Sequence, residues 1–148
     1  MNKIILTISF IIAFYWGQGQ SVNLNLLKSK KWLTQSATSA KPLDLNQKGV
    51  SSTDLLSQSP FCTSDDIFIF KDIGVFKIDD NKFDCSSLSN SNGSWKLIGK
   101  DTLSIKFDKE SSPIKFKVLK LDQNRLTLLA NMPFLQNGVD VTYEFKSK

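Results

Sequence analysis

The chain has 148 residues, of which 41% are hydrophobic and 22% charged, with a formal net charge of +5 at pH 7 and no histidine. This length suits one globular domain, and a charge of this size is typical of an ordinary solvated surface. The lack of histidine excludes a Ser/His/Asp triad, a Cys/His nucleophile pair and a histidine-bearing metal site. We therefore expect a protein that is not an enzyme and holds no cofactor.

The N-terminal segment has the pattern of a secretory signal peptide. Lys3 gives it a positive start, residues 4–16 are almost entirely apolar, and Gly17-Gln18-Gly19 supplies the small residues of a cleavage site. The apolar run is too short for a membrane span, which needs about 20 residues. We predict that residues 1–19 are removed on export. Residues 20–148 then form a single domain, periplasmic or secreted, without a membrane span.

The front of the exported chain is less regular than the rest. Leucines at helical spacing in residues 22–31, with Ser21 as an N-cap, predict one short helix. A strand that contains a tryptophan follows over residues 32–36. Residues 37–61 form a long connection, in which we expect a second short helix at residues 54–57.

Two apolar-rich runs, residues 66–71 and 75–79, predict a β-hairpin. The loop between them, Asp72-Ile73-Gly74, ends in a glycine, which suits a type I turn followed by a left-handed bulge residue. The register that this loop imposes gathers the large apolar side chains on one face. In that register Phe70 faces Phe76, and Phe68 faces Ile78.

The two cysteines of the chain flank this hairpin. Cys62 and Cys85 fall one residue out of register at its open end, a mismatch that a single bulge absorbs. In an exported protein we therefore expect a disulfide between them, worth about 3 kcal/mol in the chain-entropy model. A redox pair is disfavoured, because the spacing is far from CxxC and no cation is near to stabilise a thiolate.

From residue 93 onward, apolar and polar residues alternate with the period of two that is typical of half-buried strands. Five further strands are predicted, over residues 93–98, 101–107, 114–119, 125–130 and 139–146. Pro113 and the Asp122-Gln123-Asn124 turn separate three of them. The total is eight strands, each with one apolar and one polar face.

Eight antiparallel strands of this kind favour an all-β, up-and-down barrel, because closure removes both sheet edges and buries the apolar faces. A two-sheet β-sandwich is the alternative. The helix at residues 54–57 is expected to lie across one barrel mouth. The lysines that point outward lie on the solvated faces of the strands. We expect no nucleic-acid binding, because no aromatic residues share that face to stack on bases.

The barrel interior is the candidate ligand site. Its large apolar side chains either fill a core completely or leave room for one small ligand. Tyr143 is the only predicted inward residue with a hydroxyl group. The candidate residues, including one at the portal, are Trp32, Phe68, Phe70, Phe76, Trp95, Leu97, Ile105, Phe107, Phe116, Leu128, Phe134, Tyr143 and Phe145.

The segment 131–138 is unusually apolar for a loop. Its side chains Met132, Phe134 and Leu135 need burial, so they either close the barrel end or form a portal lip that touches a ligand or a partner.

Acidic residues in turns are common, and the acidic run 79–84 lacks the EF-hand pattern, so we expect no metal site. We interpret the pair Asp65-Asp66 as marking the start of a strand rather than as an acid/base couple.

Several short motifs occur in a fixed order along the chain: Lys31-Trp32-Leu33, Cys62 with Asp65-Asp66-Ile67-Phe68-Ile69-Phe70, Gly74-Val75-Phe76, Cys85, Gly93-Ser94-Trp95-Lys96-Leu97, Asp101-Thr102-Leu103 and Thr142-Tyr143-Glu144-Phe145. In this order and spacing, residues 26–146 resemble the small secreted lipocalin-like proteins of gram-negative bacteria. The resemblance implies an eight-stranded barrel, often without a characterised ligand, and no catalytic residues.

Two functions remain open at this point. The first is a non-enzymatic carrier of a small hydrophobic molecule, which requires space inside the barrel. The second is an interaction module for an envelope protein or a glycan, with a fully packed barrel and an exposed apolar patch.

Overall fold

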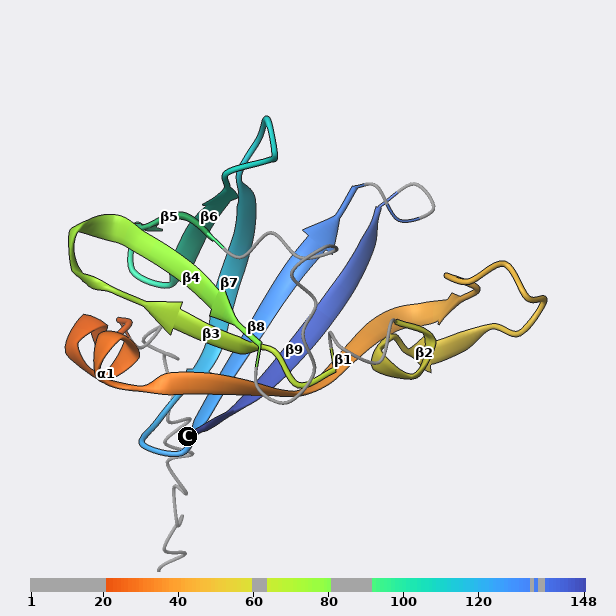
Figure 1. Ribbon diagram of the computed structural model, residues 1–148, viewed down its shortest axis with the longest axis horizontal. Coiled ribbons are helices and arrows are strands. Elements are labelled where there is room, and N and C mark those ends of the chain that lie inside the picture. The colour runs from red at the N-terminus through yellow and green to blue at the C-terminus, as the bar shows by residue number, and fades with distance from the viewer. Residues whose placement is uncertain (1–20, 60–63, 81–91, 134, 136–137) are drawn as a thin grey trace, which may run out of the picture.

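The computed structural model describes residues 21–59, 64–80, 92–133, 135 and 138–148 (Figure 1). These residues form one antiparallel sheet, one α-helix and two 3₁₀ helices. The strands are β1 (Lys31–Leu43), β2 (Ser52–Asp54), β3 (Ile67–Phe70), β4 (Val75–Asp79), β5 (Asn92–Ile98), β6 (Thr102–Phe107), β7 (Ile114–Leu121), β8 (Arg125–Met132) and β9 (Val139–Ser147). The helices are α1 (Leu24–Ser29), η1 (Leu56–Gln58) and η3 (Asp72–Gly74).

The sheet closes into a barrel. Each strand from β3 to β9 pairs with the next, and β1 pairs with both β3 and β9. The closed barrel therefore contains eight strands, β1 and β3 to β9, which confirms the predicted barrel and excludes the β-sandwich. Bulges at Gln35 in β1 and at Leu119 in β7 interrupt the ladders and add the local twist that closure needs.

The β3–β4 hairpin has the predicted register, with Phe70 opposite Phe76 and Phe68 opposite Ile78. Its turn differs from the predicted type I turn. Gly74 has the expected positive φ of 72°, but Ile73 also has a positive φ of 62°, and the backbone N–H of Val75 donates to the carbonyl of Asp72. Two successive left-handed residues make a type I′ turn, whose twist matches that of the strands better than type I does.

This turn leaves a β-branched residue in a strained conformation. Ile73 is fully exposed, so no packing offsets the cost of about 1 kcal/mol that a positive φ imposes on it. We expect Ile73→Asn to raise the free energy of unfolding by about 1 kcal/mol, because asparagine tolerates this conformation. Urea unfolding measures the change. Ile98→Asn, at an exposed position in β5, is the control without this gain, and a decrease for Ile73→Asn would contradict the argument.

The front of the chain departs from the prediction in two ways. Helix α1 is capped by Asn23, whose side-chain oxygen accepts a hydrogen bond from the backbone N–H of Leu26 at 3.1 Å, and not by Ser21. Strand β1 continues to Leu43 and pairs with β2, so the predicted long connection begins with a strand. This β1–β2 arm extends past the barrel (Figure 1). The short helix predicted at residues 54–57 is instead the 3₁₀ helix η1 at Leu56–Gln58, because Asp54 belongs to β2; η1 packs against β1 and β2.

The two ends of the barrel differ. At one end, here the α1 end, lie α1 and the turns that connect β3 to β4, β5 to β6 and β7 to β8; the backbone N–H of Val22 bonds there to the carbonyl of Lys100. At the other end, here the loop end, lie the connection β6–β7 (residues 108–113) and the described residues of the connection β8–β9, namely 133, 135 and 138. No helix in the described part of the chain is long and apolar enough to cross a membrane.

Several sequence predictions concern residues outside the described ranges. These are the signal peptide of residues 1–19, the disulfide between Cys62 and Cys85, and the portal role of Phe134. Met132, predicted in a loop, instead ends β8 opposite Val139 and is buried. The half-buried Leu135 packs against the core, and its backbone N–H donates to the Met132 carbonyl at 3.0 Å.

Candidate functional site

All of the predicted interior residues in the described part of the chain belong to one apolar cluster or pack against it. The reason is the strand period of two, which sends alternate side chains of every strand to the same side of a closed sheet. Buried members are Trp32, Phe70, Phe76, Trp95, Ile105, Phe116, Leu128 and Phe145, and half-buried members are Phe68, Leu97, Phe107 and Tyr143. The structure therefore brings the predicted set together.

Aromatic rings cross the interior in contact with one another. Phe68 on β3 lies 4.8 Å from Phe145 on β9 and 5.2 Å from Phe76 on β4, measured between ring centroids. Phe76 in turn lies 5.5 Å from Phe107 on β6, edge to face. Each such aromatic pair stabilises the folded protein by about 0.5–1.5 kcal/mol more than the burial of its apolar surface alone. The rings therefore form a packed layer across the barrel.

Gly93 permits the contact between Phe76 and Phe107. It stands opposite Phe76 in one ladder and opposite Phe107 in the next, so it lies between the two rings on the inner face. A Cβ at this position would lie only 2.3 Å from the backbone oxygen of Lys106. The missing side chain thus allows β5 and β6 to approach closely and the two rings to meet over the glycine.

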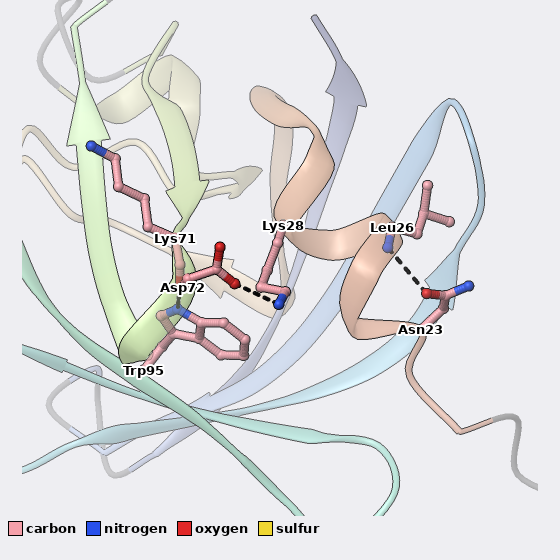
Figure 2. A network of polar contacts seen from close by, with 6 residues as sticks. All are labelled: Asn23, Leu26, Lys28, Lys71, Asp72 and Trp95. Atoms are coloured by element: carbon pink, nitrogen blue, oxygen red, sulfur yellow. Dashed lines mark hydrogen bonds and ion pairs between the residues drawn. The ribbon is translucent and has the colours of Figure 1, made fainter.

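Two tryptophans close the α1 end. The indole N–H of Trp32 donates to the carbonyl of Leu27 in α1 at 2.9 Å, and neither residue is accessible to solvent. The indole N–H of Trp95 donates to the carbonyl of Lys71 at 2.9 Å, beside the β3–β4 turn (Figure 2). An ion pair of 2.6 Å between Lys28 and Asp72 also joins α1 to this turn, but its exposure limits its contribution to stability.

Some inward-facing side chains at the loop end remain accessible to solvent. Phe107 ends β6, Ile114 begins β7, and both are half-buried although they face inward. Phe68 and Tyr143, on β3 and β9, are half-buried too. A side chain on the inner face of a closed barrel can meet solvent only through the interior space or a barrel mouth. The loop-end group, defined as Phe68, Phe107, Ile114 and Tyr143, therefore presents partly exposed apolar surface at this end of the barrel.

A second set of half-buried inward residues, Leu97, Val118 and Leu121, lies toward the α1 end. Val118 and Leu121 border a shallow depression against Ser21–Asn23, at the foot of α1. Between the two sets lie residues with essentially no exposure, namely Phe76, Leu103, Ile105, Leu126 and Leu128. The middle of the barrel is therefore packed, and of the two half-buried sets only the loop-end group contains aromatic side chains.

The comparison with known protein families agrees with this architecture. The family model described as the lipocalin-like domain matches residues 30–128, from the residue before β1 into β8. The chain belongs to the lipocalin-like domain family. This confirms the lipocalin-like domain that the motifs indicated. Among curated proteins, no match to the chain is found.

The lipocalin-like fold suggests binding of a small ligand, and its family is generally non-enzymatic. In this lipocalin-like barrel the ligand would meet mainly apolar surface with a few polar groups, as is usual for small-molecule sites. The polar groups on the inner face therefore decide which ligand chemistry fits.

Tyr143 is one such group. Burial raises the pKa of its hydroxyl to about 12, so it is neutral and can donate a hydrogen bond at physiological pH. Its ring stacks on Phe145, and its hydroxyl has no hydrogen-bond partner among the described residues. The prediction that it is the only inward hydroxyl is wrong. Thr34 and Ser39 share the inner face of β1, but their hydroxyls already donate to the carbonyls of Asp66 and Lys41.

Asp66, predicted only to mark the start of a strand, is a second polar group of this kind. It is only 8% exposed, and its backbone carbonyl accepts hydrogen bonds from the backbone N–H and the hydroxyl of Thr34. Its Oδ1 atom is buried and has no hydrogen-bond partner in the described structure. Burial first, and then the charges of Asp80 and Asp65, raise the pKa of this carboxyl from 3.8 to about 7.

The alternation along β3 could have identified Asp66 as inward-facing. It precedes β3 by one residue and has the same parity as Phe68 and Phe70, which face the interior. The hairpin register, continued by one residue beyond the Ile67–Asp79 pair, places Asp80 opposite it. Asp80 itself follows β4 and is exposed, but its charge acts on the inward-facing Asp66 carboxyl near the loop-end group.

These carboxyl groups do not form a metal cluster that the described residues can complete. Across residues 21–59, 64–80, 92–133, 135 and 138–148, no three cysteine, aspartate or glutamate side chains gather as metal ligands. The acidic run 79–84 is described only to Asp80, and Asp79 is engaged by Lys77 at 2.7 Å on the outer face.

Proposed function

We propose that this lipocalin-like protein is a non-enzymatic binding protein that takes one small hydrophobic molecule into the loop-end half of its barrel. The observation that carries the proposal is the partial exposure of the loop-end group, whose side chains face inward on four different strands. Burying their remaining apolar surface against a ligand contributes about 25 cal/mol per Å².

The packed middle of the barrel limits the size of this ligand. Phe76 is inaccessible to solvent, and its ring contacts those of Phe68 and Phe107. A long acyl chain would have to displace these rings, which would separate favourable edge-to-face pairs. A compact molecule of one or two rings fits the proposal better than a fatty acid.

Titration with the neutral fluorescent probe N-phenyl-1-naphthylamine tests the proposal. We expect a blue-shifted, saturable signal with one site per chain, and a loss of affinity of about tenfold or more in Ile114→Lys, because a charge in an apolar site is costly. Leu119→Lys is the matched control, since Leu119 is half exposed on the outer face of the same strand. It should bind as the wild type does.

Failure of the probe to bind the folded wild type would favour the alternative function. In that case the aromatic interior is only a core, and the protein acts through its outer surface on an envelope protein or a glycan. Equal loss of affinity in Ile114→Lys and Leu119→Lys would place the probe outside the barrel and would also contradict the proposal.

We further propose that the protein acts outside the cytoplasm, in the periplasm or after secretion. The signal-peptide pattern of residues 1–19 and the cysteine pair Cys62 and Cys85 support this location. Intact-mass measurement of the protein made by an exporting host tests both features. We expect the mass of residues 20–148 less two hydrogen atoms. A retained leader, or free thiols under non-reducing conditions, would contradict the respective feature.

A further inference from the structure

We propose that the ligand of this barrel carries a cationic amine, which the carboxylate of Asp66 binds at the loop-end half of the interior. This inference rests on the proposed binding function and adds the chemistry of the ligand's polar end. It starts from Asp66, an acidic residue that faces the interior, is 8% exposed and leaves Oδ1 without a partner in the described part of the chain.

Among the described residues, the Asp66 Oδ1 atom lacks the partner that usually stabilises a buried charge. Buried carboxylates in proteins are ordinarily paired with a cation or satisfied by several hydrogen-bond donors. The hydroxyl of Thr34, a side-chain donor on the adjacent strand β1, donates instead to the backbone carbonyl of Asp66. The charges that act on the Asp66 carboxyl, those of Asp80 and Asp65, are both negative.

Because both neighbouring charges are negative, the site favours a positively charged occupant over a neutral or an anionic one. This local excess of negative charge contrasts with the net positive charge of the chain, +5. The preference therefore belongs to the site and does not follow from the overall charge of the protein.

The apolar neighbours of Asp66 suit an organic cation better than a metal ion. On the same inner face, Phe68 lies two residues along the strand, is half-buried, and contacts the rings of Phe76 and Phe145. An ammonium group is attracted to aromatic faces as well as to a carboxylate, and its organic body would contact the loop-end group. A divalent ion would instead need more oxygen ligands than the described residues gather.

The test compares two probes of the same shape, 2-phenylethylamine and 2-phenylethanol, by calorimetry at about pH 8.5. At this pH the Asp66 carboxyl is ionised, and an alkylamine is still protonated. We expect the wild type to bind the amine about tenfold more tightly than the alcohol, since a charge-assisted hydrogen bond is roughly twice as strong as a neutral one. Asp66→Asn should reduce this ratio to about twofold or less, without weakening alcohol binding.

Two further variants make the result specific. Asp79→Asn removes a carboxylate from the outer face of β4, where it pairs with Lys77, and should leave the ratio unchanged. Asp80→Asn removes the exposed carboxylate opposite Asp66 and should lower the ratio by a smaller factor than Asp66→Asn does. Circular dichroism confirms that each variant is folded.

The outcomes separate this inference from the function on which it rests. Equal binding of the amine and the alcohol to the wild type would overturn the amine site and leave a hydrophobic binding protein. Binding of neither compound, together with no binding of the naphthylamine probe, would overturn both. A preference for the amine that survives Asp66→Asn would show that another group holds the cation and would overturn the assignment to Asp66.

Discussion

Replacing Gly93 with alanine is expected to lower the free energy of unfolding by about 3 kcal/mol. This value is near the upper end of the destabilisation caused by adding a side chain at a closely packed position. The added Cβ would lie 2.3 Å from the backbone oxygen of Lys106 and 3.1 Å from the Cα of Phe107. Backbone atoms cannot rotate away as a side chain does, so β5 and β6 would have to separate. Urea unfolding followed by tryptophan fluorescence measures the change.

Ser94→Ala is the matched control for this prediction. Ser94 is the next residue of β5, pairs with Lys106, and is exposed on the outer face. A change within about 0.5 kcal/mol is expected there, as for most surface substitutions. If Gly93→Ala were as mild as Ser94→Ala, the close approach of β5 and β6 over this glycine would be wrong.

The second large effect is a dependence of stability on pH that comes from Asp66. Its pKa is about 7 in the folded protein against 3.8 for the free side chain, so the folded state holds a proton that the unfolded state releases. Its contribution to stability is therefore complete below about pH 4, falls as the pH rises to about 7, and is constant above that. A shift of this size sets an upper bound of about 4 kcal/mol on the loss, and solvent that reaches the carboxyl makes the actual loss smaller.

Urea unfolding at several pH values between about 4 and 8 measures this dependence. We expect the wild type to lose stability across this range and Asp66→Asn to remove most of the slope, because asparagine does not titrate. A slope that is the same in wild type and Asp66→Asn would show that the carboxyl is solvated and that the buried acid is not a feature of the protein.

Asp122 provides a control with the opposite sign. Hydrogen bonds from the backbone N–H groups of Asn124 and Arg125, and the nearby charge of Lys120, lower the pKa of its carboxyl. Its contribution to stability is therefore present above its ordinary pKa and is lost only as the pH falls below that value. Asp122→Asn should weaken the β7–β8 turn and leave the slope between about pH 4 and 7 as it is in the wild type.

The alternation of apolar residues was enough to predict the barrel. Strands with large side chains on one face, such as β6 with Leu103, Ile105 and Phe107, reveal their period directly. The glycine of the β3–β4 loop gave the register of that hairpin, which the structure confirms. The β1–β2 arm was not predicted because its inward residues, Ala37 and Ser39, are small and do not produce the alternation of large apolar and polar residues that identifies a strand.

The distinction between the two ends of the barrel could not be predicted from the sequence. Phe107 and Phe116 are the same residue type on neighbouring inward faces, yet Phe116 is 3% exposed while Phe107 is half-buried. This difference depends on how far each side chain stands from the barrel mouth, which is a matter of strand stagger. The alternation along β3 indicates that Asp66 faces inward, but it does not reveal that the side chain is only 8% exposed.

Methyl NMR of the isoleucine side chains tests the central claim, that the loop-end half of the interior takes a small apolar ligand. We expect titration with 2-phenylethanol to shift the methyl signals of Ile114 and Ile78, which lie on the inner face toward the loop end. The signals of Ile73 and Ile98, which are exposed on the outside, should stay in place. Shifts confined to Ile73 or Ile98, or no shift of Ile114 at saturating probe, would contradict the account.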